Sequence, residues 1–261
     1  MTDKLVTVIT GGGTGVGAAL ARLLAERGHQ VVIAGRRQAP LDAVAADTGA
    51  TVVVGDIATE AGAKALVDAA IKAHGKINNL VLNAGIVTNG TVTDYPVADW
   101  QATIDINLTA NFLLAKFALP ELVKTKGSIV GVSSIASLRS GYGMSAYAAS
   151  KAGFTALIQN IAYDYAKHGV RANVVCPGWI LTEMAEGEFA EAAAHKNTTV
   201  ENIFKEILKF VPQQRASSPM EQAKPIAWLL TDEASYITGS SLVVDGGTII
   251  TDPGMLNLHT N

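Results

Sequence analysis

The sequence predicts an α/β fold in which a doubly wound parallel sheet carries helices on both faces. Apolar runs of strand length alternate along the chain with longer stretches of helical period. The strand-length runs are apolar throughout, which is typical of strands that are covered on both faces. Their short connections to the helices favour parallel strands joined by right-handed crossovers.

Length and composition fit one domain over residues 1–261. The chain is 49% apolar and 16% charged, which is enough for one sizeable core. A net charge of −3 gives no reason to expect nucleic-acid binding. Cys176 is the single cysteine, so no intrachain disulfide can form, and a reducing, cytoplasmic location fits. Because no charge-free apolar run approaches the length of a membrane span, we expect no membrane partner.

The first half of the chain divides into four strand–helix pairs. The predicted strands are residues 5–10, 30–35, 51–56 and 79–85. The predicted helices are residues 17–28, 40–49, 60–75 and about 97–124. Gly28 and Gly49 mark two helix ends, and Pro120 is expected to interrupt the fourth helix near its end.

The second half adds strands at residues 127–134, 170–178 and 241–247, and a helix at 143–169. Residues 182–218 break the alternation and predict one or two amphipathic helices. An insertion at this place is a candidate substrate lid. We assign no chemistry to the tail, residues 249–261, which we expect to cover a neighbouring subunit.

A glycine-rich loop lies between the first predicted strand and helix, in the sequence TGGGTGVG at residues 10–17. Glycines let the backbone approach a pyrophosphate, and the N-terminus of the following helix offers free N–H groups. A P-loop is disfavoured because no Gly-Lys-Ser/Thr follows, and the spacing is not Gly-x-Gly-x-x-Gly. Taken alone, the loop also fits a glycine-rich turn without a ligand.

Tyr147 and Lys151 stand four residues apart in a predicted helix, so both side chains lie on one face. A nearby ammonium lowers the pKa of a phenol, which makes the tyrosine usable as a general acid or base. Ser134 ends a predicted strand at the ligand end of the sheet, and Ser133 competes for the same role. Asn107 lies inside a predicted helix, where asparagine is unfavourable unless its amide is used. The alternative is that Tyr147 and Lys151 are two side chains on the surface of a helix, with no role in catalysis.

These motifs together resemble the short-chain dehydrogenase/reductase family, in its short single-domain branch with a Rossmann-type fold. The resemblance covers nearly the whole chain. It rests on TGGGTGVG at 10–17, GDI at 55–57, NAG at 83–85, Asn107, VSS at 132–134, YAASK at 147–151, PGWILT at 177–182 and VDGG at 244–247.

The resemblance implies a mechanism of hydride transfer between a nicotinamide cofactor and a secondary alcohol or its ketone. It implies that Tyr147 exchanges a proton with the substrate oxygen, and that Lys151 lowers the tyrosine pKa and holds the nicotinamide ribose. It favours Ser134 over Ser133 as the residue that positions the C–O group. In that family, the asparagine that matches Asn107 perturbs its helix and holds a water that relays protons to the lysine. No metal is expected.

The cofactor is expected to be NADP, with NAD as the alternative. Gly35 stands where an NAD-selecting acid would end the second strand, and Arg36 and Arg37 follow it. A guanidinium suits a 2′-phosphate, although Thr14 occupies a place that is basic in some NADP-preferring relatives. The expected cofactor contacts are Thr10, Gly11, Gly13, Thr14, Gly15, Val16, Gly17, Arg36, Arg37, Asp56, Ile57, Asn83, Ala84, Gly85, Tyr147, Lys151, Pro177, Gly178, Ile180 and Thr182.

The substrate is expected to be mostly apolar, with cyclic alcohols or ketones included, because Leu138, Tyr142, Met144 and Trp179 are the candidate wall. An enoyl reductase is disfavoured by the narrow Tyr–Lys spacing, and an epimerase or dehydratase by the short chain. A nucleotide-sensing protein without catalysis would be expected to lack one of the four catalytic residues. The resemblance also implies a homodimer or homotetramer built on the helices at about 97–124 and 142–168.

Overall fold

The computed structural model describes residues 4–252, and its strands form one parallel sheet. The strands are β1 (Val6–Thr10), β2 (Gln30–Gly35), β3 (Thr51–Val54), β4 (Asn79–Leu82), β5 (Ser128–Val132), β6 (Arg171–Pro177) and β7 (Ser241–Val244). Their order in the sheet is β3-β2-β1-β4-β5-β6-β7. From β1 the strand order runs outward to β3 on one side, and from β4 it runs outward to β7 on the other. The pair β1 and β4 is therefore the topological switch point. The predicted doubly wound fold is confirmed.

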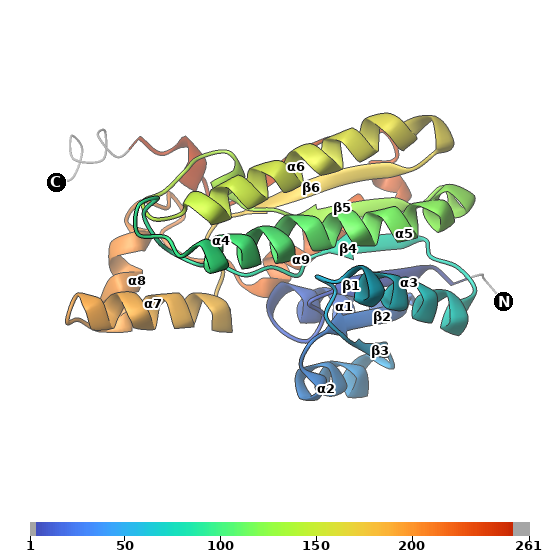
Figure 1. Ribbon diagram of the computed structural model, residues 1–261, viewed down its shortest axis with the longest axis horizontal. Helices are drawn as coiled ribbons and strands as arrows, with labels where there is room; N and C mark the ends of the chain where they lie inside the picture. Colours follow the sequence, from blue (N-terminus) through green and yellow to red (C-terminus); the bar gives the residue numbers. More distant parts are fainter. Residues whose placement is uncertain (1–3, 253–261) are drawn as a thin grey trace.

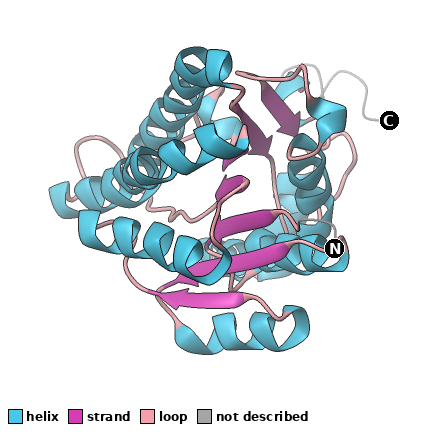
Figure 2. Ribbon diagram, turned by 90° about the vertical axis from the view of Figure 1, so that its right-hand side faces the viewer, coloured by secondary structure: helices cyan, strands magenta, loops and turns pink. Residues whose placement is uncertain are grey.

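Helices cover both faces of this sheet, as Figure 2 shows. The long helices are α1 (Gly15–Glu26), α2 (Gln38–Thr48), α3 (Glu60–His74), α4 (Val97–Ile104), α5 (Ala110–Thr125), α6 (Ser145–Tyr165), α7 (Glu183–His195), α8 (Val200–Leu208) and α9 (Pro219–Leu229). Short 3₁₀ turns are Ile135–Ser137, Ala166–His168, Asp232–Ala234 and Thr248–Ile250.

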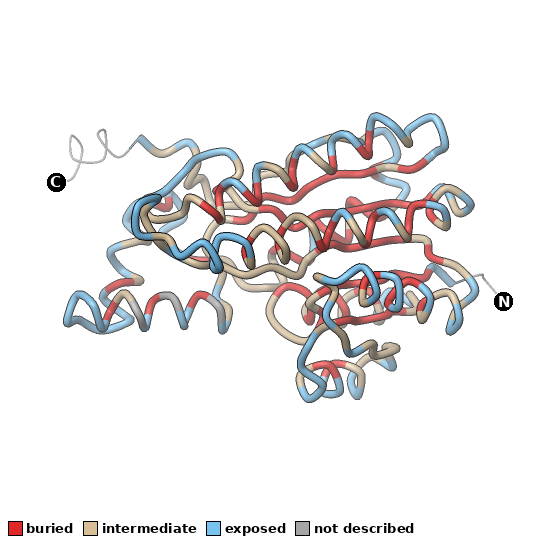
Figure 3. Tube along the Cα trace, viewed as in Figure 1, coloured by how far each residue is buried: buried red, intermediate tan, exposed pale blue. Residues whose placement is uncertain are grey.

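Two hydrophobic clusters, one on each side of the sheet, form the core. Residues of α3, α5 and α6 pack together on one face, and residues of α1, α2 and α9 pack together on the other. The strands lie between these layers and contain the longest buried stretches of the chain (Figure 3). Phe154 of α6 and Leu20 of α1 are fully buried examples from the two sides.

The predicted helix at 97–124 is divided into three parts. A π-helical turn, Asp105–Thr109, separates α4 from α5. Pro120 does not end α5, which continues to Thr125. The proline and the residue one turn earlier, Lys116, are both exposed, so water can bond the Lys116 carbonyl that the proline leaves without a donor.

The stretch Val97–Thr125 is long and apolar enough, by length and composition, to cross a membrane. In the fold it instead packs against the sheet, and Leu114, Ala118 and Leu122 are fully buried there. This is the arrangement of a core helix.

Helix α9 directly follows the insertion, and a local signal in the sequence marks its start. Ser218 accepts a hydrogen bond from the Glu221 amide, and the Glu221 carboxylate accepts one from the Ser218 amide. This reciprocal pair is a capping box, followed here by Pro219 at the first helical position. Gln222 and Ile226 then bury one face of α9 against the sheet side that α1 also covers.

The segment between β6 and α9 folds into two helices, α7 and α8, at the carboxyl end of the sheet (Figure 1). They share a small hydrophobic cluster of their own, built from Ala185, Phe189, Ala193 and Ile203. Trp179, which follows β6, packs against this cluster, with its ring centroid 5.5 Å from that of Phe189. The insertion therefore has a small core of its own, against which the aromatic side chain of Trp179 packs.

At Gly17, the backbone of helix α1 packs directly against the backbone of the glycine loop. A Cβ at this position would lie 2.2 Å from the Gly11 carbonyl oxygen. We expect Gly17→Ala to lower the free energy of unfolding by about 1–3 kcal/mol, because overpacking of this size forces backbone shifts. Gly55→Ala is the matched control, since a Cβ there meets nothing within 4 Å. Urea unfolding of the cofactor-free protein measures both, and equal stability of the two variants would contradict the expectation.

Candidate active site

A cavity of about 870 Å³ opens at the carboxyl edge of the sheet. Its walls come from the loops after each of the strands β1 to β6, from α6, from the start of α7 and from the segment after β7. The predicted residues that line it are Gly11, Gly13, Thr14, Gly15, Val16, Arg36, Arg37, Asp56, Ile57, Asn83, Ala84, Gly85, Ser134, Met144, Tyr147, Lys151, Pro177, Gly178, Trp179, Ile180 and Thr182. The structure thus brings together most of the residues that the sequence singles out.

The glycine loop has the form of a phosphate cradle. Gly11 and Gly15 have φ values of +65° and +53°, which disfavour any other residue. A Cβ at Gly13 would come within 3.1 Å of the Pro40 side chain. Thr14 precedes α1 without making a side-chain cap, so the first N–H groups of the helix stay available to an anion. These features fit the pyrophosphate of a dinucleotide.

Thr10 was predicted to bind cofactor, but it lies behind the cavity wall. Its hydroxyl oxygen accepts hydrogen bonds from the amides of Asn83 and Ala84, both at 3.0 Å. The Asn83 side chain donates in return to the Thr10 carbonyl at 2.9 Å. These bonds join the ends of β1 and β4 at the switch point. Gly17, also predicted as a contact, likewise stands behind the wall because it packs on Gly11.

The end of the cavity near β2 carries both signs of charge. Arg36 and Arg37 line its rim, and Asp56 lies across from them at the end of β3. The Arg37 guanidinium lies 3.7 Å from the carboxylate of Glu183, the first residue of α7. Both side chains are well exposed, so water screens this ion pair.

The first turn of α7 also meets the glycine loop. Thr182 caps α7 by accepting a hydrogen bond from the Ala185 amide at 3.3 Å. Its methyl carbon would lie 3.3 Å from a Cβ at Gly15. The insertion therefore starts directly over the phosphate cradle.

Lys151 buries its ammonium group at the end of β5. The side chain donates to the Val132 carbonyl at 2.9 Å, and its nitrogen lies 5.7 Å from the centre of the Tyr147 ring. Burial lowers the pKa of Lys151 from its ordinary 10.5 to about 8, and the charge interaction with Cys176 partly opposes this. A Cβ at Gly85 would come within 3.4 Å of the same nitrogen, so a residue without a side chain stands beside the ammonium.

Asn107 lies in the π-helical turn and is fully buried. Its side-chain oxygen accepts from the Ile86 amide at 2.8 Å, and its nitrogen donates to the Ile86 carbonyl at 2.9 Å. The same nitrogen donates to the Ser150 hydroxyl at 3.1 Å. Asn107 does not line the cavity, and its side chain fixes the loop after β4 against α6.

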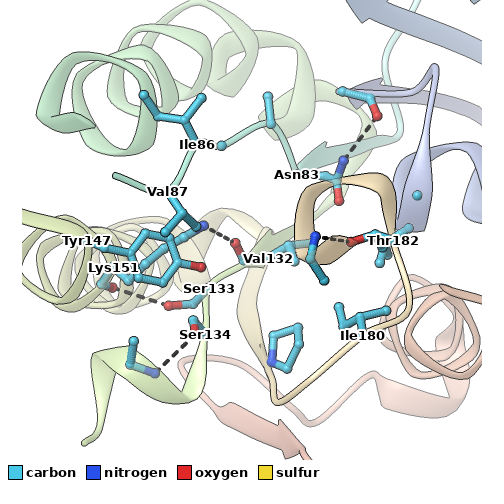
Figure 4. Close-up of a pocket in the computed structure, with 18 of the residues that line it drawn as sticks. Asn83, Ile86, Val87, Val132, Ser133, Ser134, Tyr147, Lys151, Ile180 and Thr182 are labelled. Atoms are coloured by element: carbon cyan, nitrogen blue, oxygen red, sulfur yellow. Dashed lines mark hydrogen bonds between the residues drawn. The ribbon is translucent and has the colours of Figure 1, made fainter. Parts of the chain in front are cut away.

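The two candidate serines have different surroundings. The Ser133 hydroxyl is buried, and it bonds to the Lys151 carbonyl at 3.2 Å and the Thr155 hydroxyl at 2.9 Å. Ser134 accepts from the Ala136 amide at 3.1 Å, which leaves its O–H available toward the cavity. In Figure 4 the Tyr147 and Ser134 hydroxyls turn toward the same part of the pocket. The geometry favours Ser134, because the packing already uses Ser133.

Two of the four predicted substrate contacts lie outside the cavity. Leu138 and Tyr142 line a second, shallower depression of about 700 Å³, whereas Met144 borders both. Tyr142 is 93% exposed, because the loop after β5 turns outward before Gly143, which has a φ of +71°. These two residues lie apart from the main cavity, and their contact with the substrate stays a prediction.

The structure also supplies cavity residues that the sequence analysis missed. They come from the loop after β5, from the end of α8 and from the segment after β7, and include Ile135, Arg139, Phe210, Thr248, Ile249 and Thr251. No short motif identifies them, because they meet only in the folded chain. Part of the tail, for which we predicted a cover over a neighbouring subunit, thus lines this chain's own cavity. Residues 253–261 lie outside the described part of the chain.

Comparison with known proteins agrees with this geometry. Residues 11–248 match the family model described as "Enoyl-(Acyl carrier protein) reductase". The chain is 36% identical over 251 residues to Protein MoaE of Klebsiella aerogenes, covering 95% of this chain and 96% of the relative. It is 33% identical over 253 residues to meso-2,3-butanediol dehydrogenase of Serratia marcescens, covering 96% of each chain.

A solved structure gives the same result for the fold. The F189W actinorhodin polyketide ketoreductase with NADPH superposes with a TM-score of 0.91 at 27% identity, covering 95% of this chain and 98% of the other.

The buried ammonium should weaken the fold at neutral pH. Because folding lowers the pKa of Lys151, its cost is fully present below pH 8 and fades as pH rises toward 10.5. At about 1.36 kcal/mol for each pH unit between about 8 and 10.5, this cost is on the order of 3 kcal/mol. We expect Lys151→Met to be more stable than the parent at pH 7, with a gain that shrinks by pH 10.

Urea unfolding at both pH values measures this difference. Lys72→Met, a substitution of an exposed lysine, is the control and should show no such pH dependence. A Lys151→Met variant that is less stable than the parent at pH 7 would contradict the expectation.

Proposed function

Because the chain belongs to the short-chain dehydrogenase/reductase family, we propose that it is an NAD(P)-dependent oxidoreductase that interconverts a secondary alcohol and its ketone. The observation that carries this proposal is that the glycine loop lines the same cavity as Tyr147, Lys151 and Ser134. A family member that had lost catalysis would be expected to lack part of this set.

The cofactor, when bound, supplies or accepts the hydride. In our proposal the Tyr147 hydroxyl gives its proton to the ketone oxygen in reduction and takes it back in oxidation. The buried Lys151 ammonium stabilises the phenolate that forms. Ser134 donates its O–H to the same substrate oxygen and fixes the C–O group. Asn107 acts indirectly, because its side chain bonds to both the amide and the carbonyl of Ile86 in the loop after β4.

NADP is the cofactor we propose, with NAD as the alternative. Gly35 offers no carboxylate to the ribose, and Arg36 and Arg37 border that end of the cavity. A guanidinium makes charge-assisted hydrogen bonds to a phosphate. A 2′-phosphate would compete with the Glu183 carboxylate for Arg37, and an exposed ion pair of this kind costs little to break.

We propose a small, mostly apolar substrate, cyclic ketones included, because Met144, Trp179, Phe210 and Ile249 line the cavity. Helices α7 and α8 act as a lid in this proposal. The description of the matching family model names an enoyl reductase. We favour carbonyl reduction, because Tyr147 and Lys151 stand only four residues apart.

We further propose a homodimer or homotetramer that works in the cytoplasm. Phe112 on α5 and Tyr163 on α6 are large side chains exposed at 49% and 87%, which supports contacts between copies through these helices. The single cysteine, Cys176, is buried and free, which suits a reducing compartment.

The proposed reaction is tested by initial rates of cofactor oxidation against a panel of aliphatic, cyclic and aryl ketones, with NADPH and NADH in parallel. We expect turnover that is faster with NADPH. Binding of a cofactor without turnover of any ketone or enoyl compound would favour a nucleotide-sensing protein instead.

Tyr147→Phe removes the proton donor and keeps the ring. We expect kcat for ketone reduction to fall by about 10²–10⁴-fold, the usual contribution of a general acid. The Kd for NADPH should stay within about threefold, which fluorescence titration measures. A variant that keeps more than a tenth of the parent kcat would contradict the assigned role.

Arg37→Ala tests the proposed cofactor preference. Loss of a charge-assisted hydrogen bond to a 2′-phosphate should raise KM for NADPH by about 10–100-fold. KM for NADH should change by less than about threefold, because NADH has no such phosphate. The matched control is Arg27→Ala, since Arg27 is an exposed arginine outside the cavity. Equal changes with both cofactors would argue against NADP selection by Arg37.

A further inference from the structure

We propose that Arg139 binds a carboxylate on the substrate, so that the physiological substrate is a ketone or alcohol that is also a carboxylic acid. This inference rests on the proposed function and narrows its substrate class. The apolar walls would hold the carbon skeleton, and Arg139 would fix its far end.

Arg139 lies at the substrate end of the cavity. It follows Ser134 by five residues and lines the same cavity as Ser134 and Tyr147. The neighbouring walls are apolar, with Met144 from the start of α6 and Ile249 from the segment after β7. Unlike these apolar side chains, Arg139 is an exposed residue, so water solvates its charge until a ligand displaces that water.

The charge of Arg139 has no acidic partner among residues 4–252. Other arginines do have one, since Arg37 pairs with Glu183 and Arg215 pairs with Glu221 at 2.7 Å. The two acids that line the cavity, Asp56 and Glu183, both belong to the cofactor end. Among the described residues, the substrate end therefore carries a positive charge without an acidic partner.

The guanidinium is nevertheless held in place on one side. Its Nη1 donates to the Thr251 carbonyl at 3.0 Å and to the Ile249 carbonyl at 3.4 Å. These carbonyls orient the group without neutralising it. Because a guanidinium has five N–H donors, the Nη2 and Nε edge is left for a ligand. Two parallel N–H groups on that edge match the two oxygens of a carboxylate.

A carboxylate is favoured over a phosphate because Arg139 offers a single positive charge. The other cations of the cavity are Arg36 and Arg37 at the cofactor end and the buried Lys151. A phosphate dianion commonly requires more than one cation or a helix N-terminus beside it. Neither is present next to Arg139 in the described part of the chain.

The test compares a series of methyl ketones that end in a carboxylate, with linkers of increasing length, against their primary amides. Each amide has nearly the shape of its acid but no charge. With NADPH, we expect the parent protein to reduce at least one acid with a kcat/KM about tenfold or more above that of its amide. Arg139→Gln should lower kcat/KM for that acid by about 10–100-fold, mainly through KM. Its kcat/KM for the amide should stay within about twofold.

Two further variants separate charge recognition from structure. Arg139→Lys keeps the charge without the planar fork and should retain part of the preference for the acid. Arg27→Gln removes an exposed arginine outside the cavity and should leave the preference unchanged.

Several results would overturn the proposal. One is a parent protein that treats acid and amide alike at every linker length. Another is an equal loss on both substrates in Arg139→Gln, which would mean that Arg139 only anchors the segment after β7.

If the parent turned over no ketone with either cofactor, the proposed function would fail separately. Calorimetric titration of the acids and amides into the parent and Arg139→Gln proteins, each saturated with NADPH, would then decide whether Arg139 binds carboxylates. Binding of an acid that is lost in Arg139→Gln would support the site, and no difference between the two proteins would end it.

Discussion

Burial of the Lys151 ammonium is the constraint on which the arrangement of the cavity depends. A cation without solvent is costly, and the surrounding elements are placed so that it can stay. The end of β5 supplies the Val132 carbonyl as acceptor. The loop after β4 passes close by, which is feasible because Gly85 has no side chain. Ser133 bonds to the Lys151 carbonyl and so fixes α6 to β5. The lysine that the proposed chemistry needs thus determines which residues its neighbours can be.

The loop after β4 is held at both of its ends, which makes the floor of the cavity rigid. Thr10 and Asn83 join its start to β1, and Asn107 clamps Ile86 farther along. The π-helical turn that carries Asn107 interrupts the regular hydrogen bonding of the helix. The Asn111 side chain supplies a donor to the Asn107 carbonyl at 2.8 Å. In contrast, α7 and α8 pack on a separate small cluster, so the proposed lid can move without disturbing this floor.

The sequence predicts those parts of the protein whose signals are local. Apolar strand runs and the glycine loop indicate the doubly wound sheet, and the spacing of Tyr147 and Lys151 places both on one helix face. Helix α9 also has a local signal, the capping box that begins at Ser218. The position of Leu138 and Tyr142 outside the cavity could not be predicted, since closeness in sequence to Tyr147 says nothing about where a loop turns. Arg139 meets Thr251 across 112 positions, and no local pattern reports such a contact.

The charges differ between the two ends of the cavity. At the cofactor end, Arg37 has Glu183 within ion-pair distance, so a phosphate that binds there must displace one anion with another. At the opposite end, the partners of the Arg139 guanidinium among the described residues are backbone carbonyls. Carbonyl dipoles orient a cation but leave its net charge in place, so an anion that arrives there displaces no acid. A carboxylate that binds Arg139 therefore replaces water, whereas a phosphate that binds Arg37 must also break the exposed ion pair with Glu183. A strictly neutral substrate would make no use of the positive charge that Arg139 places at this end of the cavity.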